Sequence, residues 1–283
     1  MRPFACAALA AFLSPAALAQ SAPVSSGLPS PAEVSNRDTL TIGAGVAWIP
    51  DYEGSNDYRM IPAGAVRGKY RGIAFNTNGT YLYVDLVPGN GKVTLDAGPI
   101  IGLRFDNRRR SDDPIVRQMI RRKTAIEAGG FGGVSFHGIL DAYDSLSFRL
   151  DVLHDIGSAH RSTLFDPNVS FSTPVSRRTY VSLGAGAEFV SSKFANYYFG
   201  VTPADVIATG GALPLYSPRG GMKNWKVNLL LDQSITGNLL GGLSVFGLGQ
   251  YSRLVGDFRR SPIVAQRGSA GQWLGAAGLA YTW

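Results

Sequence analysis

Apolar and polar residues alternate along most of the chain with a period of two. Near the start, Leu40, Ile42, Ala44, Val46 and Trp48 alternate with small or polar residues. Side chains of a β-strand point alternately to its two faces, so this pattern predicts a strand with one apolar face.

The longest alternating segment, residues 93–106, carries charge on its second face. Leu95 and Leu103 share the apolar face, whereas Asp96 and Arg104 lie on the other. Soluble strands usually have five or six residues, whereas membrane-spanning strands need about 9 to 11. The length of this segment therefore favours a transmembrane strand with lipid on its apolar side.

Alternating segments recur as far as the C-terminus. Twelve strands are predicted, at residues 38–50, 58–68, 71–77, 80–87, 92–106, 123–136, 144–154, 166–173, 178–190, 223–234, 238–252 and 272–283. The long connections between them, 107–122, 155–165, 191–222 and 253–271, all fall on one side. This asymmetry predicts an all-β fold, a single antiparallel transmembrane β-barrel with short periplasmic turns and long extracellular loops. The third and fourth strands are short, so ten strands are the alternative.

The same alternation places a set of charged side chains inside the barrel. They are Asp96, Arg104, Glu127, Arg149, Asp151, Glu188, Lys226 and Asp232. Unpaired charge in a narrow interior is unfavourable, so we expect a cross-strand network that fills the lumen. The alternative is an open, ion-selective pore, because interior space grows with strand number.

The last strand carries an expected assembly signal. Leu279, Tyr281 and Trp283 alternate up to a terminal aromatic residue, an arrangement that resembles the signal read by the barrel assembly machinery of outer membranes. We expect charge at these positions, or deletion of Trp283, to stop membrane insertion.

The first 19 residues have the pattern of a secretory signal peptide. Arg2 supplies the positive charge, residues 4–13 the apolar core, and Ala17-Leu18-Ala19 the cleavage site. Residues 20–37, rich in Ser, Pro and Ala, are expected to form a flexible leader, and residues 38–283 the barrel. Cys6, the one cysteine, lies in the signal peptide, so we expect no disulfide in the mature chain. The expected location is the outer membrane of a Gram-negative cell.

Composition narrows the choice of fold further. The chain has 35 glycines in 283 residues and only 17% charged residues, which argues against a solvated helical protein. Its net charge of +7 falls to +6 when Arg2 is removed with the signal peptide. A basic excess in an exported protein suggests contact with anionic surfaces, although simple solubility explains it equally well.

Several short motifs resemble the MltA-interacting protein family (MipA/OmpV). They are Pro50-Asp51-Tyr52-Glu53-Gly54-Ser55, Tyr197-Tyr198-Phe199-Gly200-Val201-Thr202-Pro203, Tyr216-Ser217-Pro218-Arg219-Gly220-Gly221, Arg253-Leu254-Val255-Gly256-Asp257, Ser261-Pro262-Ile263-Val264 and Tyr281-Thr282-Trp283. These motifs follow the family's order from end to end of the expected barrel. The final Trp, where members usually have Phe, and the absence of the usual Gly-His pair at residues 154–160 are departures from the pattern.

The resemblance implies an outer membrane barrel that, in some members, is a scaffold linking a lytic murein transglycosylase to a peptidoglycan synthase. Other members are described as adhesins, osmotic or antibiotic-response proteins, or minor pores, and the family supplies no catalytic residues. We therefore expect a non-enzymatic scaffold or partner-binding protein of the cell envelope. A small passive channel is the alternative, and a lipid or peptide hydrolase at the barrel rim is a third class.

The strongest cluster of basic residues lies in one predicted outer loop. It comprises Arg108, Arg109, Arg110, Arg121 and Arg122. Guanidinium groups bind phosphate through two hydrogen bonds, so lipopolysaccharide is a candidate ligand, the alternative being a solvated loop. The loop is exported and lacks interleaved aromatic residues, so no nucleic acid partner is expected.

Catalysis has weak support in the sequence. His154, Asp155, Ser158 and His160 are residue types that hydrolases use, but His154 and Asp155 would point to opposite faces of a strand, and no GxSxG motif is present. Histidines are not clustered and the mature chain has no cysteine, so neither metal nor cofactor is expected.

The outer loop over residues 191–222 is long and rich in apolar residues. Tyr197, Tyr198, Phe199 and Leu213 are too apolar to extend into water, so we expect the loop to fold inward or across the mouth of the barrel. The intact barrel should then conduct ions poorly, and excision of residues 195–218 should raise its conductance.

Overall fold

The structure is a computed structural model, and it describes residues 37–106, 108–237 and 239–283. The expected signal peptide over 1–19 and the expected leader, apart from Arg37, lie outside the described residues. Among the described residues, no helix has the length and apolar character needed to cross a membrane.

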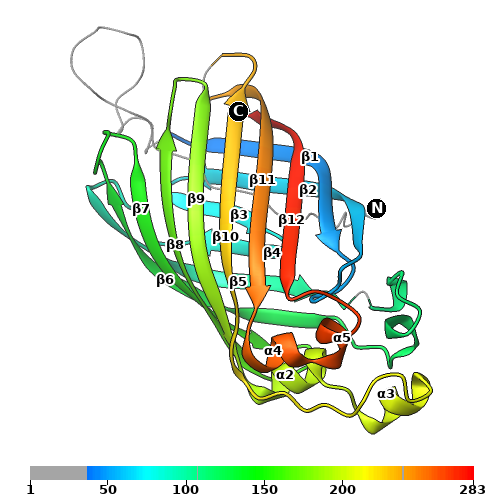
Figure 1. The fold of residues 1–283 in the computed structure, drawn as a ribbon. Helices are drawn as coiled ribbons and strands as arrows, with labels where there is room; N and C mark the ends of the chain where they lie inside the picture. The colour runs from blue at the N-terminus through cyan, green and yellow to red at the C-terminus, as the bar shows by residue number, and fades with distance from the viewer. Residues whose placement is uncertain (1–36, 107, 238) are drawn as a thin grey trace, which may run out of the picture.

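Twelve antiparallel strands form one closed barrel (Figure 1). Consecutive strands pair with each other, and β1 pairs with β12 to complete the wall. The strands are β1 (Thr39–Pro50), β2 (Tyr58–Tyr70), β3 (Ile73–Asn78), β4 (Tyr81–Asp85), β5 (Val93–Arg104), β6 (Ala125–His137), β7 (Ser145–Asp155), β8 (Thr163–Pro174), β9 (Thr179–Val190), β10 (Gly221–Ser234), β11 (Gly242–Leu254) and β12 (Gly271–Thr282). The predicted fold class is confirmed, with twelve strands instead of ten.

The two ends of the barrel differ as predicted. All helices among the described residues lie in the connections at one end, which we call the loop end (Figure 1). They are η1 (Arg108–Arg110), η2 (Val116–Gln118), α2 (Ser192–Phe199), α3 (Pro203–Ala208), α4 (Gly256–Arg260) and α5 (Pro262–Ala265). The opposite end, the turn end, has the shorter connections and the chain's C-terminus.

An aromatic belt runs along the outer face near the loop end. Trp225 of β10 packs on Tyr251 of β11, and Tyr251 packs on Trp273 of β12, with ring centroids 5.5 and 4.9 Å apart. The Trp273 backbone N–H donates to the hydroxyl of Tyr58, whose ring stacks on Trp48 at 4.1 Å. The belt thus continues over five neighbouring strands.

A second pair of aromatic residues marks the turn end of the same wall. Tyr281 and Trp283, at the end of β12, pack with ring centroids 4.6 Å apart. Eight residues separate Trp273 from Tyr281, which is about 27 Å of strand and about 21 Å across a membrane at the usual tilt of about 40°. This spacing agrees with the apolar band of about 25 Å in outer membrane barrels.

The hairpin of β3 and β4 is shorter than its neighbours, so it covers only part of β2. On β2, the ladder with β3 includes Arg67–Tyr70 alone. Beyond it, the Thr77 hydroxyl accepts from the Val66 N–H and donates to the Val66 carbonyl oxygen. The rest of β2 toward the loop end pairs with β1 on its other edge. By the alternation of an antiparallel strand, Pro62 turns its nitrogen toward the side without a partner strand.

The wall opposite the charged strands is apolar on its inner face. Small side chains of β1, β2 and β12 pack there against the Phe246 ring of β11. The members of this cluster are Ala47, Ala63, Ala65, Phe246, Ala276 and Ala280. The eight charged residues predicted for the lumen lie on the strands from β5 to β10, whereas Arg67 is a charged lumen residue on β2.

Candidate functional site

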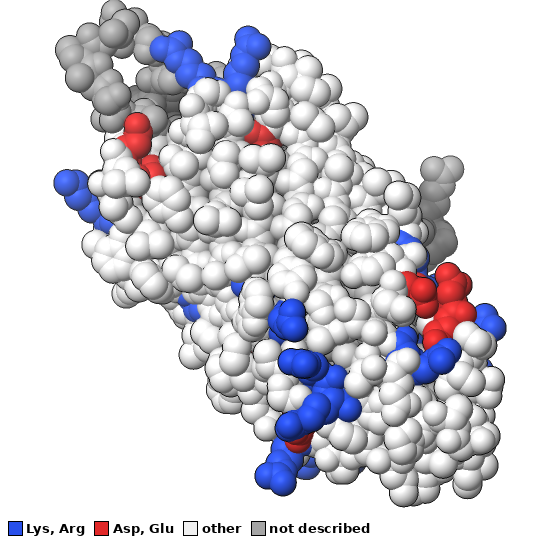
Figure 2. Space-filling model, in the orientation of Figure 1, with Lys and Arg blue, Asp and Glu red and all other residues white. Residues whose placement is uncertain are grey.

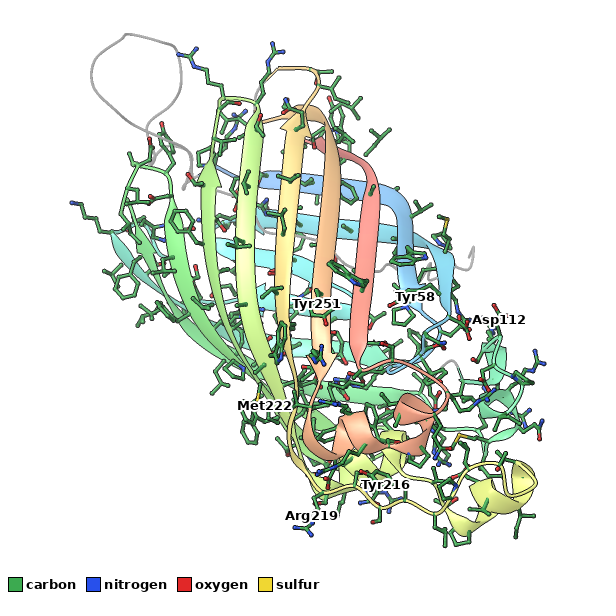
Figure 3. All side chains as sticks on the ribbon, in the orientation of Figure 1. Tyr58, Asp112, Tyr216, Arg219, Met222 and Tyr251 are labelled. Atoms are coloured by element: carbon green, nitrogen blue, oxygen red, sulfur yellow. The ribbon has the colours of Figure 1, made fainter. Side chains whose placement is uncertain are left out.

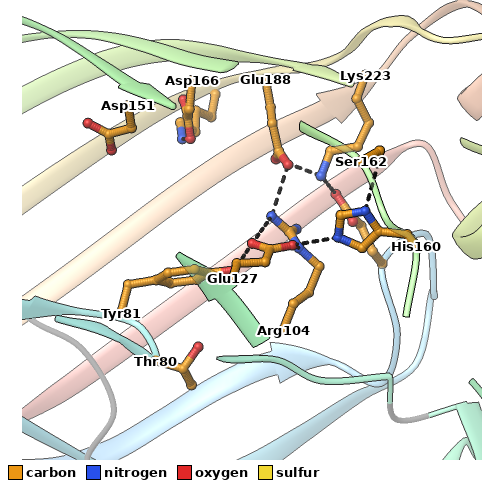
Figure 4. A network of polar contacts seen from close by, with 12 residues as sticks. Thr80, Tyr81, Arg104, Glu127, Asp151, His160, Ser162, Asp166, Glu188 and Lys223 are labelled. Carbon is orange, nitrogen blue, oxygen red and sulfur yellow. Dashed lines mark hydrogen bonds and ion pairs between the residues drawn. The ribbon is translucent and has the colours of Figure 1, made fainter. Parts of the chain in front are cut away.

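Arg104 is the centre of a polar network just below the loop end (Figure 4). Its guanidinium reaches Glu127 Oε1 on β6 at 2.8 Å and Glu188 Oε1 on β9 at 3.1 Å. The second oxygen of Glu188 pairs with Lys223 Nζ at 2.6 Å, and Lys223 also pairs with Glu53 at 2.6 Å. Opposite charges from β5, β6, β9, β10 and the β1–β2 loop therefore join across the lumen.

Glu127 accepts hydrogen bonds from two further groups. The Tyr81 hydroxyl donates to its Oε2 at 2.6 Å. The ring of Tyr81 fits there because Gly102 lies opposite, where a Cβ would approach the ring to 2.2 Å. The other oxygen, Oε1, lies 3.0 Å from His160 Nε2. Glu127 is fully buried, and these partners together with Arg104 compensate the loss of water around its carboxylate.

His160 is held in the lumen by the way its loop folds. Asp155, at the end of β7, accepts hydrogen bonds from the backbone N–H groups of Gly157 and Arg161, and closes the loop into a compact turn. Ser158 and Arg161 both have positive φ, at 60° and 49°. The turn aims the imidazole inward, where it is enclosed by Phe194 and Tyr198.

The helix α2 closes the mouth of the barrel above this network. Ser191 caps the helix by accepting from the N–H of Phe194. The Phe194 ring is fully buried and lies between two cations, 5.1 Å from the Arg104 guanidinium carbon and 5.2 Å from Lys223 Nζ. Cation–π contacts of this kind are strongest where water is excluded. The loop therefore folds across the mouth, as its composition predicts.

Contacts with the β11–β12 loop hold α2 in place. The Ser261 hydroxyl donates to the Phe199 carbonyl oxygen at 2.5 Å, and the Phe199 and Phe258 rings pack edge to face. The Tyr216 hydroxyl donates to the Asp257 carbonyl oxygen at 2.8 Å. The β9–β10 and β11–β12 loops are thus joined over the lumen.

The loop after β5 is tied to the same cap by a buried carboxylate. Thr202 and Asp205 form a reciprocal capping box at the start of α3, with Pro203 in its first turn. Asp205 also pairs with Arg122 at 2.8 Å. Burial raises the pKa of Asp205, but hydrogen bonds from Thr202 and Arg122 outweigh this effect and hold that pKa below its ordinary value.

Two more ion pairs lie deeper in the lumen, below the network around Arg104. Lys226 reaches Asp166 at 2.5 Å, and Arg149 reaches Asp151 at 2.8 Å. The Tyr83 hydroxyl donates to Asp151, and its ring lies under the Arg149 guanidinium. The side chains of Arg149 and Lys226 are 29% and 21% exposed, so solvent reaches this part of the lumen.

The remaining predicted lumen residues lie nearer the turn end and do not join the upper network. Asp96 accepts from the Ser135 hydroxyl at 2.5 Å. Asp232 has an electrostatic interaction with Arg67 of β2. All eight predicted residues are on the inner face, but the structure distributes them over several levels.

The five arginines of the predicted lipopolysaccharide loop have different surroundings. Arg108 is buried, and its guanidinium donates to the Tyr198 carbonyl oxygen. Arg122 is the partner of Asp205, whereas Arg109, Arg110 and Arg121 are exposed. Lipopolysaccharide contact at this loop stays a prediction, with only these three side chains on the surface.

Lys223, His160 and Phe194 are central to the network, and the sequence pattern does not identify them. The register of β10 shifts between Met222 and Asn224, so this β-bulge places Lys223 inside although the alternation from Lys226 predicts the opposite. The positive-φ turn after β7 determines the position of His160. Helix α2 determines the position of Phe194, and it lies where the alternating pattern predicts only a long loop. Two family-like motifs lie near them, since the motif at 197–203 begins three residues after Phe194 and the motif at 216–221 ends two residues before Lys223.

His160 also lies in a Ser–His–Glu chain. Its Nδ1 is 2.8 Å from the Ser162 hydroxyl, and its Nε2 faces Glu127. Such a chain can relay a proton. However, Ser162 is only 6% exposed and the imidazole is covered by aromatic rings, so the hydroxyl has no access for a substrate. His154 points outward and bonds Thr163, away from Asp155.

Solved structures that this chain resembles include three from Pseudomonas aeruginosa. OpdQ is 10% identical with a TM-score of 0.30, over 87% of this chain and 97% of that chain. OccK11 (OpdR) is 12% identical with a TM-score of 0.28, over 87% and 95%. A FadL homologue is 10% identical with a TM-score of 0.27, over 89% and 90%. These scores are too low to support an inference, so the barrel assignment rests on the strand pairing itself.

A search of curated proteins gives no match. The family model described as "MltA-interacting protein MipA", in contrast, matches residues 42–283, which is the whole barrel except for the beginning of β1. The match agrees with the resemblance of the loop motifs and with the twelve-stranded barrel described above. The chain therefore belongs to the MltA-interacting protein (MipA) family of outer membrane β-barrel proteins.

Proposed function

We propose that this protein is a non-enzymatic scaffold of the outer membrane, which binds a murein transglycosylase and, through it, a peptidoglycan synthase on the periplasmic side. The family's description as MltA-interacting supports the first partner. The closed mouth is the observation that carries the proposal. With Phe194 fully buried between Arg104 and Lys223, the barrel is better suited to presenting a surface than to passing a solute.

The surface offered for such a partner is the turn end. Its connections expose large apolar side chains, among them Leu140 at 83%, Val175 at 62% and Ile139 at 48%. Asp144 fixes one turn, since its carboxylate accepts from the N–H groups of Ile139 and Leu140. Exposed apolar groups on a rigid frame are typical of protein contacts.

The test is capture of envelope proteins from detergent extracts with an affinity-tagged barrel. The variant Leu140→Lys should lose most of the transglycosylase that the unmodified barrel captures. Ile207→Lys is the matched control, because Ile207 is 81% exposed but lies in α3 at the loop end. Equal capture by both variants, or equal loss, would contradict a contact at the turn end.

A passive channel is the second candidate, supported by the solvent-exposed Arg149 and Lys226 side chains in the lumen. Planar bilayers separate the two candidates. The scaffold proposal expects poor conductance for the intact barrel and higher conductance after excision of residues 195–218, which removes most of α2 and all of α3. Large, steady channels in the intact protein that do not respond to the excision would favour the channel.

The absence of enzymatic activity is part of the same proposal. The Ser162–His160–Glu127 chain is buried, and Glu127 is already bonded to Arg104 and Tyr81. Ester and peptide substrates should therefore be hydrolysed no faster by the intact barrel than by Ser162→Ala. A rate that depends on the Ser162 hydroxyl would support the hydrolase instead.

A further inference from the structure

Basic side chains gather on the outer surface beside the aromatic belt (Figure 2). Arg253 points outward on β11, two residues beyond Tyr251 in the direction of the loop end. Around it, the β9–β10 and β11–β12 loops contribute further exposed cations. We call this set the outer arginine cluster, and it comprises Lys193, Arg219, Arg253, Arg259 and Arg260.

Backbone contacts bring the members of this cluster together. The Arg219 N–H donates to Asp257 Oδ2 at 2.9 Å, and Arg260 pairs with the other oxygen of Asp257 at 2.6 Å. The Gly220 N–H donates to the Ser192 hydroxyl, directly before Lys193. Figure 3 shows Arg219 beyond Met222 and Tyr251, at the loop end of the barrel.

The cluster has a surplus of positive charge. Among the described residues, Asp257 is its one carboxylate partner, and Lys193, Arg253 and Arg259 form no ion pair. The loop that carries Arg109 and Arg110 differs, because Asp106, Asp112 and Asp113 lie in the same segment. Figure 2 shows red and blue side by side on the right of the molecule, and mostly blue in the group at the lower middle, toward the loop end.

We propose that the outer arginine cluster, together with the aromatic belt below it, binds the phosphorylated glucosamine headgroup of lipopolysaccharide. Tyr and Trp rings settle at the boundary between acyl chains and headgroups. Arg253 is the register partner of Trp225 and lies two residues beyond Tyr251 toward the loop end. It is therefore at the level of the phosphate groups that the glucosamines carry at the membrane surface. Guanidinium groups match phosphate oxygens through paired hydrogen bonds, and this arrangement is strongest where the acyl chains exclude water.

The proposed site also has an apolar part, which would contact the acyl chains of lipopolysaccharide. Val227 and Leu229, on the outer face of β10 below Trp225, are exposed and apolar. A free phosphate would use the arginines alone, whereas lipopolysaccharide would use the arginines, the rings and this apolar wall together. The proposal is independent of the scaffold function, since it concerns the lipid-facing surface at the opposite end from the turns.

The test uses the full mature barrel, refolded in detergent without lipopolysaccharide, and diphosphoryl lipid A as the probe in native mass spectrometry. The triple variant Arg219→Gln, Arg253→Gln, Arg259→Gln should weaken lipid A binding at least tenfold. The β5–β6 loop is the lipopolysaccharide site that the sequence pattern alone suggests, so it supplies the competing prediction. On our proposal, the triple variant Arg109→Gln, Arg110→Gln, Arg121→Gln, which removes the same charge there, should change lipid A binding less than twofold. Heat-modifiable migration on gels establishes that both variants are folded.

Two further probes decide whether the phosphates and the lipid both matter. Dephosphorylated lipid A should bind the unmodified barrel as weakly as diphosphoryl lipid A binds the first triple variant. Inorganic phosphate at millimolar concentration should not displace diphosphoryl lipid A. Equal loss in both triple variants, unchanged binding of dephosphorylated lipid A, or displacement by phosphate alone would each overturn the proposal.

Discussion

Arg104 has an unusual number of partners for one side chain in the lumen. It pairs with Glu127 and Glu188 and also lies against the Phe194 ring. Removing one partner of a buried ion pair typically costs about 3–5 kcal/mol, because the remaining charge stays buried.

We expect Arg104→Leu to lower the free energy of unfolding by about 3 kcal/mol, measured by urea unfolding in detergent micelles with tryptophan fluorescence. Arg149→Leu is the matched control. The Arg149 side chain is 29% exposed and has one carboxylate partner, Asp151, to which the Tyr83 hydroxyl also donates, so a smaller cost than for Arg104→Leu is expected. Similar costs for the two variants would show that the upper network is no more tightly held than the lower pair.

Asp205 makes the cap sensitive to acid. Because its pKa is lower in the folded state than its ordinary value of 3.8, its stabilising effect is complete above that value and is lost as the pH falls below it. Conductance in planar bilayers, or cleavage of the 191–220 loop by an acid-active protease, should therefore rise below about pH 4. Asp205→Asn should have the higher conductance, or the faster loop cleavage, already at neutral pH. In this variant the same quantity should change less as the pH falls. An unchanged pH profile in Asp205→Asn would assign the acid response to another group.

At the scale of single strands, the outer and inner faces should tolerate charge differently. Leu229 faces lipid and Asn228 faces the lumen at neighbouring positions of β10. Leu229→Arg should cost roughly 2–4 kcal/mol near the membrane midplane, whereas Asn228→Arg should cost less than about 1 kcal/mol. Urea unfolding of the barrel in lipid vesicles measures both. Equal tolerance would mean that the register of β10 is wrong.

The closing strand is expected to decide insertion. Leu279, Tyr281 and Trp283 form an exposed outward row on β12, and the Trp283 N–H donates to the Leu40 carbonyl oxygen of β1. Deleting Trp283 removes one end of this row and a bond of the closing ladder. The truncated chain should lose heat-modifiable migration and remain outside the membrane fraction. Normal insertion of the truncated chain would show that Trp283 is not required for assembly.

Strands could be predicted from the sequence more accurately than the connections between them. The alternation on β5 is fixed by burial on one side and lipid on the other, so its predicted and observed bounds, 92–106 and Val93–Arg104, nearly coincide. The short helices α2 and α4 have no such repeated pattern. Their formation depends on caps such as Ser191 and on contacts with distant loops, which a local pattern does not contain.

At the scale of the whole molecule, closure of the barrel, its cap and the presence of a cross-strand charge network could be predicted, but the pairings within that network could not. The number of alternating segments and the apolar composition of the 191–222 loop can be read directly from the sequence. Which acid meets which base depends on the stagger between strands, and the bulge at Met222–Asn224 brings Lys223 rather than Lys226 to Glu188. The sequence therefore identified the inner residues without identifying their partners.

The short β3–β4 hairpin has a consequence for how two barrels meet in a crowded membrane. It leaves the edge of β2 from Met60 to Gly64 without a partner strand. The unpaired N–H and C=O groups of such an edge can pair with a strand of another copy. Pro62 stands in the middle of this edge and offers no N–H for a foreign strand. Pro62→Val would supply the missing donor, and we expect a larger dimer fraction after crosslinking in vesicles. On this expectation, the Pro62 ring hinders strand pairing between neighbouring copies where the short hairpin leaves the edge of β2 uncovered.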